Sequence, residues 1–337
     1  MLDPDQIPAE AREVLGKRIR QLGLKIEGSP VERFVHQLHR ELERKGIQRF
    51  RPVCYLTDEW GCPDGEPVIG IPFYLADPRL AQIEKAINDL ESDREIMMYM
   101  RHEAGHAFNY AYRLHATPEW RRLFGPFHRL YRERYRTVPF SRKYVRHIAG
   151  WYAQKHPDED FAETFAVWLT PRSNWRRAYQ SWPALRKLRY VDRVARDARE
   201  RDPVLPTGRF DITVDRMKLT VEQYYDRFVR QNGAALNVSL GTDLAGFFLS
   251  KGRRRKGIRP AGELFEEVRP LLTDKITYWT GVKRSIVRAL VERMVRTCKD
   301  LNLVAECGRE QQYLVELTAY GTTLALNYLR SGKFFHG

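Results

Sequence analysis

Two histidines and a glutamate form the pattern in this sequence that is best suited to chemistry. His102, Glu103 and His106 stand in the order H-E-x-x-H. On a helix, the histidines are four residues apart, so they project from one face and can bind one metal ion. Glu103 then follows the first ligand directly and can act as general base toward a metal-bound water. The pattern indicates a zinc hydrolase site that still needs a third ligand.

A second segment, residues 156–171, supplies candidates for that ligand. Its sequence, HPDEDFAETFAVWLTP, opens with a proline and three acids that suit the first turn of a helix. We predict that Glu159 is the third zinc ligand and that Glu163, one turn later, orients a ligand histidine through its free ring N–H. Glu163 and Asp160 are the alternatives as third ligand, and His156 is a weaker one. Without a metal, Glu159 would be a helix-capping acid.

The helix that carries the histidines is predicted over residues 92–113. Ser92 and Glu95 form an S-x-x-E capping box at its start. Its apolar residues recur at helical spacing, which predicts a packed face: Ile96, Met100, Ala104, Phe108 and Ala111. Tyr99, His102, His106 and Asn109 lie on a different face, so one side packs and another carries chemistry.

Two apolar segments before this helix, residues 49–56 and 66–75, read as strands separated by a turn-rich loop. Many metallopeptidases hold a substrate backbone by strand addition. We predict that residues 68–73 bind substrate through Gly70 and Ile71, with the glycine permitting close approach of a second backbone. An ordinary core strand is an equally good interpretation.

Further helices are predicted from amphipathic spacing and from capping residues. Ser29, Pro30 and Glu32 mark the start of one of them. Residues 137–157 contain no regular pattern and are interpreted as an irregular segment beside the active site. The predicted helices of this half of the chain are 8–22, 30–45, 79–91, 118–136 and, rich in basic and aromatic residues, 172–200.

The combined motifs resemble a known class of enzyme. H-E-x-x-H followed some 50 residues later by E-x-x-A-E-x-F-A is similar to the gluzincin clan of zinc metallopeptidases, in particular to the zinc-binding metallopeptidases related to the catalytic domain of anthrax lethal factor. The resemblance covers residues 50–200 and implies an α+β, zincin-like (minigluzincin) catalytic domain with a small mixed β-sheet. It also implies a role for Tyr152, seven residues before Glu159: in the family, a tyrosine here stabilises the oxyanion or protonates the leaving amine.

The length of 337 residues suggests two domains, or one large domain with an appendage. We predict a catalytic domain over 1–201 and a mostly helical C-terminal domain of unknown role over 209–337, joined by the linker 202–208. Helices are expected at 219–231, 261–273, 282–302 and 312–331, and a loop or short strand at 236–243. The basic run 251–256 is interpreted as an exposed loop, with binding to an acidic peptide, phosphate or nucleic acid as the alternative.

Composition narrows the function classes. A net charge of +15 allows a polyanionic partner, although the charge is spread along the chain and a solvated basic surface is favoured. Four scattered cysteines do not make a disulfide framework, and free thiols are expected. No apolar run of about 18 residues predicts a membrane span, and the N-terminus lacks the apolar core of a secretory signal, so a cytoplasmic location is expected.

Together these features favour a zinc metallopeptidase that hydrolyses peptide bonds in a peptide or protein substrate. One Zn²⁺ per chain would be held by His102, His106 and Glu159, with Glu103 as general base and Tyr152 as oxyanion stabiliser. Two alternatives remain. The chain could be a non-catalytic, peptidase-like binding module that keeps zinc for structure. It could also be a basic protein associated with nucleic acid, which the sequence permits but does not favour.

Overall fold

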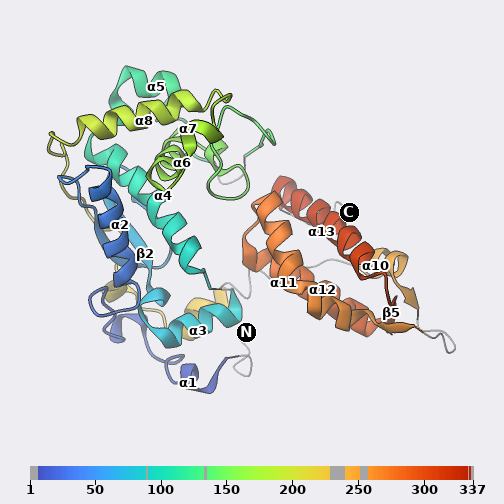
Figure 1. Cartoon of the computed structure of the whole chain (residues 1–337). Helices are drawn as coiled ribbons and strands as arrows, with labels where there is room; N and C mark the ends of the chain where they lie inside the picture. Colours follow the sequence, from blue (N-terminus) through green and yellow to red (C-terminus); the bar gives the residue numbers. More distant parts are fainter. Residues whose placement is uncertain are drawn as a thin grey trace. The chain divides into compact units, whose positions relative to one another are not determined.

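The computed structural model describes residues 7–88, 90–132, 135–227, 240–250, 257–332 and 334 (Figure 1). The contacts divide the chain into two compact units, one from residues 3–86 and 90–224 and one whose main body is residues 225–337. Residues 209–224 belong to the first unit: the Tyr224 hydroxyl donates to the Asp58 carbonyl over 2.8 Å, and Arg209 pairs with Glu66. These units are defined by contacts, so the predicted domain limits, 1–201 and 209–337, stay a prediction.

The N-terminal unit is mostly helical with a small sheet. The strands β1 (Val53–Thr57) and β2 (Val68–Pro72) pair in parallel, and Gly61 makes an antiparallel bridge to Gly70 on β2. The molecule is therefore α+β, as predicted. The helices of this unit are α1 (Ala9–Arg12), α2 (Glu32–Arg44), α3 (Pro78–Ile87), α4 (Asp93–Ala111), α5 (Pro118–Phe124), α6 (Pro157–Leu169), α7 (Trp175–Ala178) and α8 (Leu185–Asp197).

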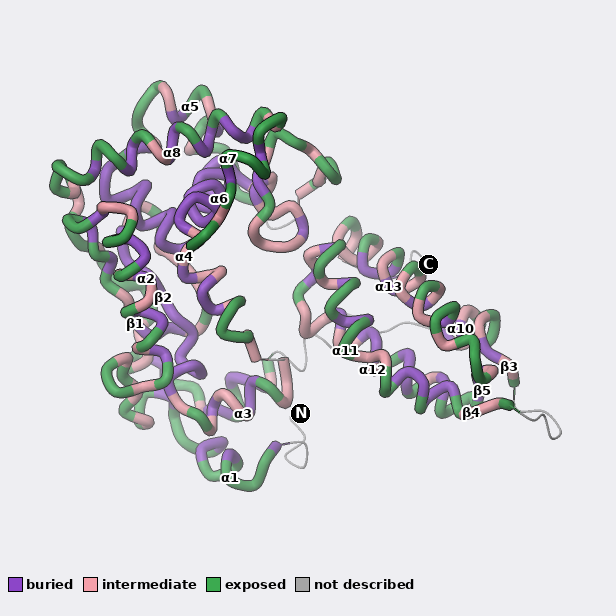
Figure 2. The backbone as a smooth tube through the Cα atoms, in the orientation of Figure 1, coloured by how far each residue is buried: buried purple, intermediate pink, exposed green. Residues whose placement is uncertain are grey.

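The centre of this unit is the packing of α4 against α6, the most extensive contact between any two of its described elements (Figure 1). Phe108 of α4 stacks on Phe165 of α6 with ring centroids 5.0 Å apart. Every residue of α6 is buried, which Figure 2 shows as a continuous buried stretch. A helix without an exposed face must satisfy its polar side chains inside the protein, and α6 carries four acids.

Several predicted elements differ from the structure. The helix predicted at 118–136 ends at Phe124, because Gly125 adopts a φ of 113° and Pro126 follows it. The helix predicted at 8–22 is only α1 and a separate turn at Ile19–Gln21. Helix α2 begins after Val31 rather than after Ser29, whose hydroxyl donates to the Ile26 carbonyl instead.

The C-terminal unit is helical around an apolar core. Its elements are α10 (Gly241–Phe247), β3 (Leu249–Ser250), β4 (Ile258–Pro260), α11 (Ala261–Thr280), α12 (Arg284–Asp300), β5 (Leu303–Glu306) and α13 (Glu310–Ser331), and the three strands form an antiparallel sheet in the order β3-β5-β4. The predicted helix at 261–273 extends to Thr280. The predicted helix at 219–231 is seen over 221–227; residues 228–231 and the basic run 251–256 lie outside the described residues, as does 236–239 of the predicted loop.

Candidate metal centre

Helix α4 presents the H-E-x-x-H residues to α6. The predicted capping box is present at its start: the Ser92 hydroxyl accepts from the Glu95 N–H, and the Ser92 N–H donates to the Glu95 carboxylate over 2.9 Å. The helix then runs without interruption past both histidines, which keeps them one turn apart on one face. His102 and His106 are both buried, 2% and 7% exposed, so they lie inside the protein rather than on a solvated face.

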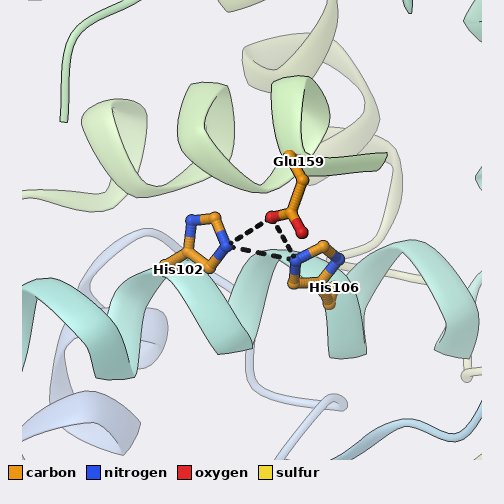
Figure 3. Close-up of side chains that lie close together, drawn as sticks. All are labelled: His102, His106 and Glu159. Carbon is orange, nitrogen blue, oxygen red and sulfur yellow. Dashed lines mark hydrogen bonds and ion pairs between the residues drawn. The ribbon is translucent and has the colours of Figure 1, made fainter. Parts of the chain in front are cut away.

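Three side chains from the two helices converge on one point (Figure 3). A single carboxylate oxygen, Oε2 of Glu159, lies 2.9 Å from Nε2 of His102 and 3.2 Å from Nε2 of His106. The two Nε2 atoms are themselves 3.2 Å apart. Two imidazole nitrogens and one carboxylate oxygen thus form a nearly equilateral triangle, within which no side chain of the described residues intervenes.

This triangle has the size that a zinc ion requires. Zinc binds imidazole nitrogen and carboxylate oxygen at about 2.0–2.2 Å with tetrahedral angles, which places neighbouring ligand atoms roughly 3.3 Å apart. The observed separations of 2.9 to 3.2 Å are close to that value. Three protein ligands also leave a fourth position open, as in catalytic rather than structural zinc sites. The donor set therefore fits a catalytic zinc ion.

A second carboxylate holds each histidine from behind. Nδ1 of His102 lies 2.9 Å from Oε1 of Glu163, and Nδ1 of His106 lies 2.7 Å from Oδ2 of Asp158. A carboxylate acceptor keeps the proton on Nδ1 and directs the Nε2 lone pair toward the centre, which is how metal-ligating histidines are usually oriented. The Ile148 N–H donates to the other Glu163 oxygen over 2.9 Å. Glu163 thus lies where an orienting carboxylate is expected.

Asp158 is a residue that the sequence did not single out as part of the site. Its carboxylate also accepts from the Asn109 amide over 2.7 Å and from the Tyr110 hydroxyl over 2.6 Å. In the sequence it looks like one of three acids suited to a helix N-terminus. The only sequence signal for a role of Asp158 in the site is that it directly precedes Glu159. Adjacent residues of a helix project in different directions, so these two carboxylates can reach different atoms of the histidines.

The alternatives for the third ligand have other partners. Asp160 is buried against the Lys187 ammonium at 2.5 Å. His156 caps α6, with Nδ1 accepting from the Asp158 N–H, while its Nε2 lies 2.8 Å from the Arg129 carbonyl oxygen. Neither side chain belongs to the three-residue cluster.

Glu103 lies beside the cluster and, unlike Asp158 and Glu163, does not hydrogen-bond to a histidine in the described structure. It is 7% exposed, and in the part of the chain that the structure describes its carboxylate makes no hydrogen bond. Burial raises its pKa, and the charges of His102 and His106 only partly offset this effect. A carboxylate whose pKa is raised toward neutrality is a stronger base than an exposed one, which suits an acceptor of protons.

The electrostatics of the cluster favour bound positive charge. Burial alone would lower the pKa of His102, but its hydrogen bonds to Glu159 and Glu163 outweigh burial and raise the pKa to about 9. Burial acts to raise the pKa of Glu159, yet the histidines beside it hold that pKa well below its usual range. In the metal-free protein these carboxylates therefore attract protons onto the histidines, and a metal ion would replace those protons.

Two tyrosines reach the remaining oxygen of Glu159. The Tyr131 hydroxyl donates to Oε1 over 2.6 Å, and the Tyr152 hydroxyl lies 3.4 Å from the same atom. The Tyr152 ring also packs edge-on against His102, with centroids 5.5 Å apart. Burial raises the pKa of Tyr152, so this phenol keeps its proton and can only donate at neutral pH. Tyr131 lies in the segment interpreted as a helix in the sequence, so no pattern identified it.

The predicted substrate strand is present, but its backbone is already paired. Gly70 donates to and accepts from the backbone of Gly61, over 2.7 and 3.3 Å, and the Ile71 side chain is fully buried. A substrate strand that used Gly70 would have to displace Gly61. The role of both residues in substrate binding stays a prediction.

Comparison with known proteins agrees with this geometry. The family model described as "Putative zinc-binding metallo-peptidase" matches residues 67–251, more than half of the chain and the whole of α4 and α6. The chain belongs to this family. No curated protein and no solved structure matches it. In the described residues, no helix is both long and apolar enough to cross a bilayer.

Proposed function

We propose that this chain is a zinc-dependent peptidase of the gluzincin type, with a zincin-like catalytic unit. The observation that carries the proposal is the triangle of His102, His106 and Glu159, with Glu103 buried beside it. The family supplies the class of metal and of reaction. The arrangement supplies residues for each step of peptide hydrolysis.

Zinc held by these three residues would supply Lewis acidity, which lowers the pKa of water and polarises a peptide carbonyl. Glu103 would take the proton of the attacking water, because it is the acid beside the cluster that is not committed to orienting a histidine. Asp158 and Glu163 would keep both imidazoles fixed throughout the reaction. The same proton would then pass from Glu103 to the leaving amine.

Tyr152 would donate its hydroxyl proton in a hydrogen bond to the oxyanion that develops on the substrate. Its hydroxyl is 3.4 Å from Glu159, which is too long for a strong hydrogen bond. Only a weak interaction would therefore be lost when the hydroxyl turns to the substrate. A donor that meets charge only in the transition state accelerates the reaction without tightening substrate binding.

The peptide substrate itself is proposed to bind as an extended strand at β2, near Gly70 and Ile71. Because Gly61 covers Gly70, the substrate would either open this bridge or pair with the outer side of the segment that contains Gly61. The Tyr55 hydroxyl also lies close to this glycine: a Cβ atom added to Gly70 would be 3.3 Å from it. The cytoplasmic location expected from the sequence stays a prediction.

A non-catalytic module that keeps zinc for structure is the weaker alternative. Such a site would need the three ligands and their orienting carboxylates, but it would have no use for Glu103. Burying an ionisable group without a partner destabilises the folded protein, so its presence here favours catalysis.

The test combines metal analysis with turnover. Zinc is quantified in the full-length protein and in the variants Glu103→Gln, Glu159→Ala and His102→Ala, and each is assayed against a peptide library. We expect about one zinc per chain in the wild type and in Glu103→Gln, and strong loss of zinc from the two ligand variants. Glu103→Gln should retain no measurable turnover. The exposed residue Glu27 offers a matched control, and Glu27→Gln should behave as wild type.

Tyr152→Phe separates the oxyanion role from metal binding. It should lower kcat by roughly 10- to 1000-fold with little change in KM or in zinc content. Turnover by Glu103→Gln at the wild-type rate would contradict the proposed mechanism, and a zinc-free wild type would contradict the proposed site.

A further inference from the structure

One segment, residues 126–155, borders the metal centre through several of its described residues, which are 126–132 and 135–155. It provides Tyr131 and Tyr152 to Glu159, and the Ile148 N–H to Glu163. The His147 ring contacts the Met98 carbonyl of α4 over 3.0 Å. The segment is therefore fixed to both helices of the site.

This segment is strongly basic. Its 30 residues contain eight lysines and arginines and one acid, Glu133, for a net charge of +7 out of the +15 of the whole chain. Lys155 places one of these charges at the site itself: its ammonium is 4.4 Å from the ring centroid of Tyr131 and 5.2 Å from that of Tyr152. Positive charge thus lies beside the two tyrosines that reach Glu159.

Most of these cations are not neutralised within the protein. Six of them are exposed and make no ion pair with any residue that the structure describes, although the last of the six lies over aromatic rings: Arg129, Arg132, Arg136, Arg142, Lys143 and Arg146. The other basic stretch, along α7 and α8, also has exposed cations without an ion pair to a described residue, among them Arg177, Arg186 and Arg189, but it is partly neutralised. There Arg176 pairs with Asp192 at 2.9 Å and Arg193 pairs with Glu119 at 2.5 Å. Either stretch could be an ordinary solvated basic surface. Only residues 126–155, however, contribute side chains that contact the candidate ligand Glu159.

We propose that the peptidase acts on acidic polypeptides, with aspartate and glutamate residues flanking the scissile bond and contacting this basic segment. The inference rests on the proposed function and adds its substrate class. Cations along one wall of a site raise the local concentration of an anionic substrate and speed its association, and both effects weaken as salt rises. Nucleic acid is the competing polyanion, but the cluster beside the cations is built for peptide hydrolysis.

The experiment uses the full-length, zinc-loaded protein and one cleavable peptide core from the library. The core is flanked on both sides either by Asp-Glu or by Lys-Arg sequences. For the wild type, kcat/KM should be at least about tenfold higher with acidic flanks at low salt, and the difference should shrink in 0.5 M salt, where the screening length falls to about 4 Å. A binding measurement on Glu103→Gln, with the same labelled peptides, gives the preference even if nothing is cleaved.

Three variants test the cations. Arg132→Gln/Arg136→Gln/Arg142→Gln should lose most of the preference while retaining zinc and helical content. The charge-preserving variant Arg132→Lys/Arg136→Lys/Arg142→Lys should keep it. As a matched control, Lys17→Gln/Arg20→Gln/Lys25→Gln removes three exposed cations elsewhere in the same unit and should leave both peptides' rates unchanged.

The outcomes are distinct for the two proposals. A zinc-loaded wild type that cleaves no peptide overturns the proposed function, and the binding measurement still decides the substrate class. Equal rates and equal binding for both flanks overturn the acidic preference, as does a preference that the glutamine triple variant leaves intact. Salt-sensitive binding of a labelled single-stranded RNA through the same cations, without any peptide preference, also overturns it.

Discussion

The two units each contain a glycine where helices approach closely, but the surroundings of these glycines differ. Gly105 lies where α4 meets α6, against the Ala162 backbone and Phe165, and these two helices also bury histidines and carboxylates. Gly321 lies where α13 meets α11, in a core built from apolar side chains. Among the described residues from 240 onward, the only buried polar side chains are Thr273 and Thr280.

This difference separates function from stability. Buried ionisable groups destabilise a fold unless each one is paired, so a cluster of them is retained for what it does. An apolar core stabilises the fold and carries no chemistry. We therefore expect the N-terminal unit to depend on ion pairs and on zinc, and the C-terminal unit to depend on packing alone.

The largest expected effect comes from breaking a buried ion pair next to the site. Lys187→Met leaves Asp160 buried without its cation and should lower the free energy of unfolding of the N-terminal unit by about 3–5 kcal/mol. Burial already raises the pKa of Asp160 to about 7 although Lys187 opposes it, so protonation relieves the variant and the loss should be smaller at pH 6 than at pH 8. Urea denaturation followed by tryptophan fluorescence measures it, since six of the seven tryptophans lie in this unit.

A similar substitution in the other unit provides the control. Lys299→Met removes a cation that pairs with Glu266 at 3.1 Å, but both side chains are about half exposed. The pair should contribute less than about 1 kcal/mol. If Lys299→Met cost as much as Lys187→Met, the contrast between the two units would be wrong.

Zinc removal should affect the same unit selectively. At a free zinc concentration a thousand times its Kd, bound zinc stabilises the folded state by about 4 kcal/mol, and a chelator removes that contribution. Hydrogen exchange read by mass spectrometry should show faster exchange in α4 and α6 after chelation and unchanged exchange in α11, α12 and α13. Equal acceleration in both units would mean that zinc is not confined to the predicted site.

The sequence predicted the metal centre better than its surroundings. His102, His106 and Glu159 lie on two helices whose starts are marked by local signals, the Ser92 capping box and Pro157. Helical spacing then decides which side chains share a face, so one packing contact between α4 and α6 brings the ligands together. Glu163 was predictable for the same reason.

The features that could not be predicted from the sequence depend on irregular backbone. Tyr131 reaches Glu159 only because the chain leaves the helical path at Gly125, whereas its neighbours in sequence suggest a continuing helix. The pairing of Gly61 with Gly70 depends on how the loop between β1 and β2 folds back, and no periodicity in the sequence encodes that path. Long-range pairing of this kind is set by tertiary packing.

A methyl group at Gly105 should disturb the site in a way that a similar change elsewhere does not. A Cβ added to Gly105 would lie 2.7 Å from Cα and 2.9 Å from the carbonyl oxygen of Ala162, and backbone atoms cannot turn aside. Gly105→Ala should therefore separate α4 from α6, lower the free energy of unfolding of this unit by about 1–3 kcal/mol and weaken zinc binding. Competition with a coloured chelator measures the affinity. Wild-type affinity in this variant would show that the ligands do not depend on the helix spacing.

The smallest effect is expected at the matching glycine of the apolar crossing. A Cβ added to Gly321 would lie 2.5 Å from Cδ1 of Ile276, the far end of a flexible side chain that can change rotamer. Alanine also gains about 1 kcal/mol over glycine in a helix interior, so Gly321→Ala should change the free energy of unfolding by less than about 1 kcal/mol and leave zinc content unchanged. Ile276→Val removes the crowded methyl group. If Gly321→Ala lowers the free energy of unfolding in the wild-type background, it should lower it less when it is introduced into the Ile276→Val variant. A loss larger than that of Gly105→Ala would mean that the apolar crossing, rather than the charged one, is the less tolerant of the two.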